Sequence, residues 1–280
     1  MLKILIATPL YPPEIGGPAT FTRFAEEELP KHGVEVAVEK FSDVRHLPNV
    51  LRHFAYFLRL LGTARRADVV LALDPLGIGL PAMLAAKLRG KRFLVRVAGD
   101  RAWETLQILN TPDVENFQKR RWGFGIELRR WVQRMVVRHA ERVIVPSEYL
   151  KRIVAMWGVP NEKIAVVYSS FRPPKITETK AEARAALGLT GHIIVSAGRL
   201  VPWKGFSALV EIVPALLRDV PDARLVIIGD GPERETLRMQ IVDCRIMFNL
   251  KLDAIFITSN IKIFIINFIR SAITNIICNL

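Results

Sequence analysis

The chain has 280 residues, half of them apolar, and its 40 Lys and Arg against 27 Asp and Glu give a formal net charge of +13. That length allows two domains of ordinary size, and the charge favours anionic partners such as phosphorylated ligands or a membrane surface. Two cysteines are too few for a disulfide scaffold or a thiolate metal site. The apolar run that ends before Pro9 is too short for a signal peptide, so we expect a cytoplasmic location.

Strands and helices are expected to alternate along the first 240 residues. Strands are expected at 2–7, 34–38, 68–73, 92–97, 142–145 and 163–168, with helices at 18–31, 48–66, 77–89, 113–139 (with a break at 123–125) and 148–156. A second series begins with strands at 192–197 and 223–228. Repeated alternation with apolar strands predicts an α/β fold built on doubly wound parallel sheets.

This alternation predicts two Rossmann-like domains, the second of them incomplete. The expected boundaries are an N-terminal domain at 1–172, a linker and approach helix at 173–190, and a partial second domain at 191–240. The linker is indicated by Pro173-Pro174 and several charges.

The composition changes at residue 241. All 17 Gly and all 17 Pro precede it, whereas 241–280 is rich in Ile and Asn. A 40-residue α/β segment without turn residues is unusual, so 241–280 is interpreted as an aberrant tail, frameshifted or truncated. Two alternatives stay open. One is a membrane anchor at 254–277, although Lys262 and Arg270 interrupt that apolar stretch. The other is a genuine but divergent domain end.

Two glycine-bearing turns follow the strands of the second series. The first contains Gly198, Arg199, Lys204 and Gly205, and the second contains Gly229, Gly231 and Glu233. Turns at the carboxyl ends of parallel strands are where open α/β sheets bind ligands. Two cations with flanking glycines predict a clamp for a diphosphate; the alternative is a solvated surface pair.

Two features of the N-terminal domain are weaker candidates. Gly16-Gly17 separates the first strand from the first helix, where backbone N–H groups suit an anion, or where glycine merely permits a tight turn. Asp100, with Glu104 nearby, follows the fourth strand and is a candidate catalytic residue that would orient sugar hydroxyls or an acceptor. The alternative for Asp100 is a helix N-cap.

A basic, Trp-bearing segment spans 119–142, with eight Lys and Arg against two Glu. Arg129, Arg130, Trp131 and Arg134 are candidates for a membrane or acceptor surface; an ordinary amphipathic helix is the alternative. Residues 52–66 have a similar character. Nucleic-acid binding is disfavoured because no nucleic-acid motif occurs.

Several chemistries are not indicated by the sequence. It has no D-x-D triplet for a metal–diphosphate, and its five His are not at metal-ligand spacing. It also lacks the G-x-S-x-G and G-x-x-x-x-G-K-[ST] motifs, which disfavours hydrolase and P-loop functions. We therefore expect neither a metal nor a cofactor.

Taken together, these motifs resemble the family-4 (group 1) retaining glycosyltransferases of the two-domain GT-B fold. The resemblance covers about residues 1 to 240 and rests on Gly16-Gly17, the segment 143–150, the 198–205 turn and the 229–233 turn. The turn with Arg199 and Lys204, together with the second glycine turn, is its most specific part.

The resemblance implies that the N-terminal domain binds the acceptor and the C-terminal domain binds a nucleotide-sugar. Arg199 and Lys204 would hold the donor diphosphate, and Gly17 would approach the donor from the opposite domain. No metal would be required, and the sugar would be transferred with retention. For a glycosyltransferase of this descent we expect a lipid-linked or cell-envelope glycan acceptor. The basic segments at 119–142 and 52–66 favour a cytoplasmic protein that is peripheral to the inner membrane.

Two departures from the family pattern affect the expected activity. The His found near the fourth strand in many members is replaced by Gly99-Asp100, and no Glu follows Glu235, although the family has an acid pair there. We therefore expect weak or no activity from this chain. The alternatives are a non-catalytic remnant, a basic membrane-surface module, and a sugar-nucleotide epimerase, which the Arg199 and Lys204 pair disfavours.

Overall fold

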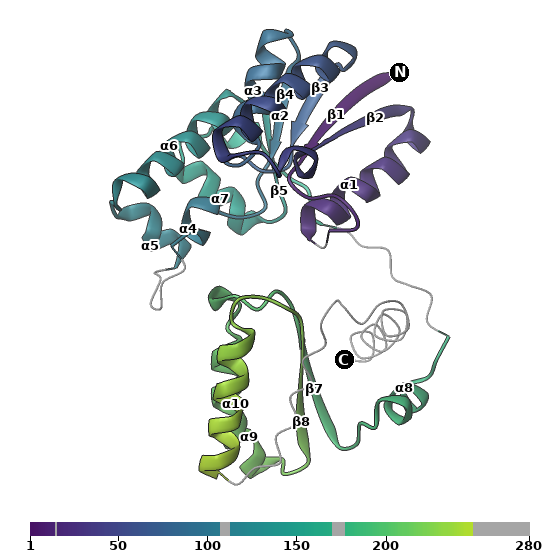
Figure 1. The fold of residues 1–280 in the computed structure, drawn as a ribbon, viewed down its shortest axis with the longest axis vertical. Coiled ribbons are helices and arrows are strands. Elements are labelled where there is room, and N and C mark those ends of the chain that lie inside the picture. Colours follow the sequence, from purple (N-terminus) through teal and green to yellow (C-terminus); the bar gives the residue numbers. More distant parts are fainter. Residues whose placement is uncertain (15, 107–112, 170–176, 249–280) are drawn as a thin grey trace. The chain divides into compact units, whose positions relative to one another are not determined.

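A computed structural model shows two compact units, unit 1 (Met1–Ser170) and unit 2 (Phe171–Leu280). The structure describes residues 1–14, 16–106, 113–169 and 177–248. Figure 1 shows the helices and strands of both units.

Unit 1 is built on six parallel strands in the spatial order β2-β1-β3-β4-β5-β6 (Figure 1). The strands are β1 (Leu2–Thr8), β2 (Val34–Lys40), β3 (Val69–Ala72), β4 (Arg92–Arg96), β5 (Arg142–Val145) and β6 (Ile164–Val166). The order reverses at β1, which pairs with β2 on one side and β3 on the other. In such sheets, ligands bind at this switch point, beyond the edge where the strands end; we call that edge the carboxyl edge.

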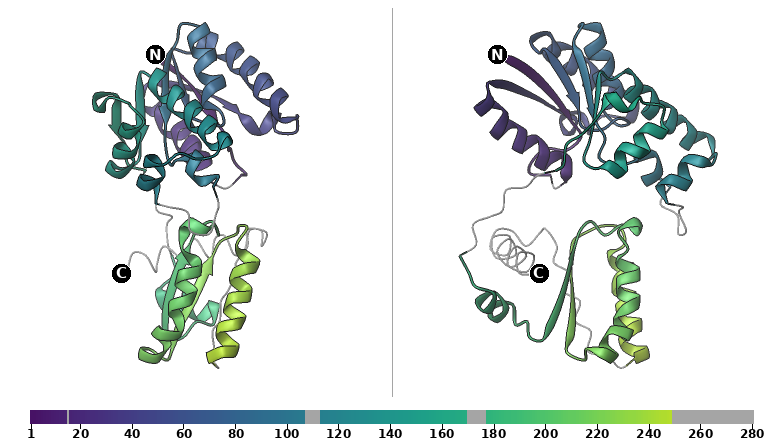
Figure 2. Two further views of the ribbon diagram at one scale, coloured as in Figure 1. Left: turned by 90° about the vertical axis from the view of Figure 1, so that its left-hand side faces the viewer. Right: turned by 180° about the vertical axis from the view of Figure 1, so that it is seen from behind.

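The long helices of unit 1 divide unequally between the two faces of the sheet (Figure 2). One face packs against α1 (Gly17–Glu28). The other face packs against α2 (Asn49–Thr63), α3 (Gly79–Leu88), α6 (Phe124–His139) and α7 (Glu148–Met156). The division follows from right-handed crossovers, because the chain moves one way from β1 to β2 and the other way in every later connection.

The main core of unit 1 lies between the sheet and these four helices. Its largest fully buried side chains include Tyr56 and Trp157, which pack with the apolar strand residues. Every residue of β3 is buried, as expected of a central parallel strand that is covered on both faces.

The described residues of unit 2 contain two parallel strands, β7 (His192–Ala197) and β8 (Ala223–Ile228). Its helices are α8 (Lys180–Leu187), α9 (Phe206–Asp219) and α10 (Arg234–Phe248). Leu200, Phe206, Leu225 and Leu237 contribute to a separate apolar core in this unit. The α/β prediction and the incomplete second Rossmann-like domain agree with this architecture.

Most expected elements are present, with shifts of a few residues at their ends. A short helix, α4 (Arg101–Glu104), follows β4 where no helix was expected. The helical region predicted at 113–139 with a break at 123–125 is two helices, α5 (Val114–Lys119) and α6, and α6 begins directly after Gly123. The last strand of unit 1 covers Ile164–Val166 instead of 163–168.

The amino-acid composition changes at residue 241, but the secondary structure does not change there. α10 runs through this position without a break, and Ile241 is buried in the core of unit 2. The rest of the proposed tail, including the 254–277 stretch, lies outside the described residues. Within the described residues, no helix combines the length and the apolar composition needed to cross a bilayer.

Candidate functional site

Two loops at the carboxyl edge of unit 2 are joined by backbone hydrogen bonds. We call residues 198–205 the clamp loop and residues 229–233 the glycine turn. The Leu200 N–H donates to the Asp230 carbonyl at 3.0 Å, and the Glu233 N–H donates to the Leu200 carbonyl at 3.2 Å. The two motifs predicted from separate parts of the sequence are therefore in direct contact, because β7 and β8 are neighbouring parallel strands.

Two glycines make this contact possible. A Cβ at Gly229 would lie 1.8 Å from the Gly198 carbonyl oxygen, and a Cβ at Gly231 would lie 2.2 Å from the Leu200 carbonyl oxygen. At Gly198 a Cβ would make only ordinary contact with the Phe206 ring. Gly205 has φ 71°, a left-handed conformation that favours glycine. The glycines at 229 and 231 are therefore explained by close backbone packing between the two loops.

The clamp loop presents two exposed cations. Buried Leu200 and Val201 anchor the loop, whereas Arg199 and Lys204 are exposed. Among the described residues, neither Arg199 nor Lys204 has a side-chain hydrogen bond or an ion pair. α9 begins directly after Gly205 without a side-chain cap, so its positive end adds to the field of these cations. Two unpaired cations beside a helix N-terminus can bind an anion.

Glu233 of the glycine turn is an unusual carboxyl group. Its Oε2 atom is buried and has no hydrogen-bond partner among the described residues. Burial raises the pKa of the Glu233 side chain above its ordinary value. Glu233 was predicted to lie in a loop of the donor pocket. Nothing in the sequence indicated that its carboxyl group would be half-buried.

Gly16 and Gly17 lie where α1 begins, beyond the end of β1. A Cβ at Gly16 would lie 2.7 Å from the Leu10 side chain, whereas one at Gly17 would contact nothing within 4 Å. The first turn of α1 has no side-chain cap, so its backbone N–H groups stay available to an anion. The end of the flexible Leu10 side chain could shift to admit a Cβ at Gly16, so sterics require glycine strictly at neither position.

Asp100 occupies a structural position. It is 3% exposed and N-caps α4, where its Oδ1 accepts hydrogen bonds from the Ala102 and Trp103 N–H groups. Gln118 and Gln133 donate to the same carboxylate at 2.7 and 3.1 Å. With both oxygens occupied inside the protein, Asp100 serves as the cap that the sequence offered as the alternative to catalysis.

An acidic residue that the sequence interpretation missed lies at the end of β3. Asp74 is 6% exposed and accepts hydrogen bonds from the Leu76 and Gly77 N–H groups. Arg101 lies 3.9 Å from Asp74 and pairs with Glu104 at 3.0 Å. These groups give the carboxyl edge of unit 1 a charged cluster. Asp74 directly follows a predicted strand, and this is the same sequence feature that indicated Asp100.

The four residues proposed as a membrane or acceptor surface on α6 do not share one environment. Arg129 and Trp131 are exposed, and Arg134 is half-buried, where burial lowers its pKa. The placement of Arg130 on a surface was wrong. Its side chain is 5% exposed and donates to the Gln118 and Arg120 carbonyls and to Glu127. The turn between α5 and α6 needs donors for its carbonyl groups, and Arg130 supplies them.

Solved structures show the type of fold. Anabaena HepE, solved with UDP and glucose, superposes with a TM-score of 0.66 at 16% identity, over 98% of this chain and 72% of that one. Sucrose-phosphate synthase from Thermosynechococcus elongatus gives 0.64 at 16% identity, over 92% and 71%. At such low identity the likeness shows the fold alone, which is the GT-B type.

Family models give the more particular assignment. The glycosyl transferase 4-like domain matches residues 5–169, more than half of the chain, and the glycosyl transferases group 1 domain matches residues 178–252. The chain therefore belongs to the glycosyl transferase 4-like family, and its second part matches the group 1 glycosyl transferases, in agreement with the sequence resemblance. The second match extends past residue 240, in agreement with the continuous α10 helix.

Curated relatives match over shorter stretches. A GDP-mannose-dependent α-(1-6)-phosphatidylinositol monomannoside mannosyltransferase of Mycobacterium tuberculosis is 42% identical over 74 residues, 26% of this chain and 19% of that protein. Its Mycolicibacterium smegmatis counterpart is 28% identical over 161 residues, 57% of this chain and 38% of that protein. The chain thus matches less than two fifths of these relatives' length.

Proposed function

We propose that this chain takes part in moving a sugar from a nucleoside diphosphate donor to a lipid-linked or cell-envelope glycan acceptor, with retention at the anomeric carbon. The observation that carries the proposal is the clamp loop, whose two exposed cations have no partner among the described residues and whose backbone is held by the glycine turn. Family membership supports the reaction class.

The clamp loop suits the electrostatic demand of this chemistry. When the bond between the anomeric carbon and the diphosphate oxygen breaks, negative charge grows on the departing diphosphate. Arg199 and Lys204 would stabilise that charge, together with the N-terminus of α9. Because these cations supply the positive charge, we expect the reaction to need no divalent metal.

The first donor to test is GDP-mannose. The mycobacterial relatives are named as GDP-mannose-dependent enzymes that act on a phosphatidylinositol mannoside, whereas Anabaena HepE was solved with UDP-glucose. We propose a hexose donor and a lipid-linked acceptor, with UDP-glucose as the comparison donor.

Nucleotide binding tests the role of the clamp loop. We expect GDP to bind the full chain more tightly than GMP in isothermal titration. Arg199→Gln and Lys204→Gln should each weaken GDP binding about tenfold or more, because each removes a charged hydrogen bond to the diphosphate. Arg218→Gln, at an exposed position on α9, is the matched control. Equal losses in the clamp variants and the control would contradict the proposal.

Turnover is measured separately, because a non-catalytic remnant would bind nucleotide without transferring sugar. Transfer or hydrolysis of GDP-mannose and UDP-glucose is followed with and without EDTA. Rates unchanged by EDTA are expected, and a loss of activity that Mg²⁺ restores would refute metal independence.

A further inference from the structure

α2 is apolar on two opposite sides. Tyr56 and Leu60 are fully buried against the sheet. Val50, Phe54 and Leu58, four residues apart, are 82%, 59% and 49% exposed. Residues at this spacing form one stripe along a helix. A surface helix normally turns charged or polar residues toward water, whereas this apolar stripe is exposed among the described residues of unit 1.

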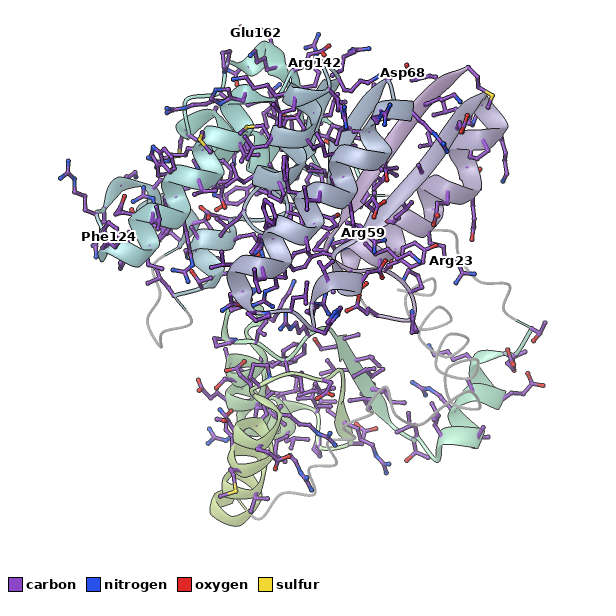
Figure 3. The ribbon with its side chains drawn as sticks, turned by 45° about the horizontal axis from the view of Figure 1, so that its top comes forward. Arg23, Arg59, Asp68, Phe124, Arg142 and Glu162 are labelled. Atoms are coloured by element: carbon purple, nitrogen blue, oxygen red, sulfur yellow. The ribbon has the colours of Figure 1, made fainter. Side chains whose placement is uncertain are left out.

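α6 carries a second stripe of the same kind. Phe124, Leu128 and Trp131 follow the helical spacing and are 84%, 47% and 60% exposed. The buried residues of α6, among them Val136 and Val137, lie on its opposite side. Figure 3 labels Phe124 at the outer end of this helix.

Both stripes face the same direction. α2, α3 and α6 pack through one core against the same face of the sheet, and α3 contacts both of the other helices. Because each stripe lies on the side of its helix away from the core, both point outward from that face. α3 adds the exposed residues Leu84 and Leu88. We call the exposed residues of these three helices, with the cations beside them, the outer face.

The charge of the outer face is one-sided. α2 and α3 contain no Asp or Glu, and Glu127, the acid of α6, pairs with Arg130. Six cations are exposed on these helices or directly after them and have no ion pair among the described residues. They are Arg65, Arg66, Lys87, Arg89, Arg129 and Arg138. Exposed apolar stripes accompanied by unpaired cations are typical of helices that lie in a membrane interface.

We propose that the outer face docks unit 1 on an anionic lipid bilayer. Its apolar side chains would enter the region between headgroups and acyl chains, and its cations would lie among the lipid phosphates. Because these three helices carry no unpaired acid, the outer face is complementary in charge to an anionic bilayer. The inference goes beyond the proposed function and does not depend on it, because vesicle binding is measured without sugar or nucleotide.

Vesicle flotation of the full chain tests this. We expect binding to vesicles of phosphatidylcholine with phosphatidylglycerol, weaker binding to phosphatidylcholine alone, and weakening by salt. Phe54→Ser combined with Trp131→Ser should abolish most of the binding. Neutralising Arg65, Arg66 and Arg129 to Gln should weaken binding about fivefold for each cation. Ile212→Ser, an equally exposed apolar site in unit 2, is the control and should bind normally.

Three outcomes would overturn the proposal. They are no binding to the anionic vesicles, equal losses in the outer-face and control variants, and self-association of the wild type that only the Phe54→Ser, Trp131→Ser variant abolishes in sedimentation. The last result would make the outer face an interface between copies of this chain. Thermal melting by circular dichroism establishes that the variants are folded, and the arginine variants test the surface without changing its apolar residues.

Discussion

The Arg130 guanidinium connects α6 to the segment that precedes it. It donates to the Gln118 carbonyl at 3.0 Å and the Arg120 carbonyl at 2.8 Å, and it lies 5.0 Å from the centre of the Phe117 ring. We expect Arg130→Ala to lower the free energy of unfolding by about 3 kcal/mol, because it leaves buried acceptors unpaired. Arg129→Ala, at the exposed neighbouring position, should change it by less than about 0.5 kcal/mol. Urea unfolding measures both, and similar effects of the two variants would contradict the buried role.

Glu233 should make the stability of unit 2 depend on pH. Burial raises the pKa of its carboxyl group in the folded state, so the folded chain binds that proton more tightly than the unfolded chain. The contribution of Glu233 to the free energy of unfolding must then fall as pH rises through the titration range of the group. Glu233→Gln should therefore be stabilising relative to wild type at neutral pH, with a smaller difference near about pH 4.

The control for Glu233 is Glu235→Gln, two residues further along the chain in the first turn of α10, where the side chain is 77% exposed. Chemical unfolding of the wild type and both variants is compared across that pH range. A difference between Glu233→Gln and wild type that stays constant with pH would show that the buried carboxyl group does not titrate differently on folding.

At the scale of elements, the contact between the clamp loop and the glycine turn depends on two missing side chains. Gly229→Ala and Gly231→Ala should each destabilise unit 2 by about 3 kcal/mol, because the new methyl group would overlap a backbone carbonyl. Gly198→Ala, in the same pair of loops, should cost much less. Thermal unfolding compares the three, and an equally mild effect at all three positions would refute close packing as the reason for the glycines.

Element boundaries were predictable where local signals were strong. The bounds of β5, β7, β8 and α7 agree with those expected from the sequence, because β-branched runs and the Ser147 cap mark them. α4 was missed because four residues are too few to show a helical period. The strand-end rule located the clamp loop and the glycine turn, but it could not reveal that their backbones would be hydrogen-bonded.

Burial of polar residues was the least predictable property of the candidate site. Asp100 and Arg130 both carry charge in segments that appear surface-exposed in the sequence, yet each is almost fully buried. Their partners are the Gln118 and Gln133 amides for Asp100, and two carbonyls of the α5–α6 turn for Arg130. Such contacts depend on how distant segments pack, which composition and periodicity do not encode.

At the scale of the whole molecule, the two units have separate apolar cores. We expect calorimetry to show two unfolding transitions, one for each unit. GDP at about one hundred times its dissociation constant should stabilise the transition of unit 2 by about 2.7 kcal/mol and leave that of unit 1 unchanged. A single transition, or a shift confined to unit 1, would contradict the placement of the diphosphate site in unit 2.

The interlocked loops of unit 2 also constrain how this site can be redesigned. Because the backbone of the clamp loop is hydrogen-bonded to the glycine turn, the two segments must be exchanged together in any chimera. Transplanting either loop alone from a relative with a different loop length would break the register of both. The exposed side chains of Arg199 and Lys204, by contrast, contribute no contact to that backbone, so ligand preference can be altered there while the scaffold is preserved.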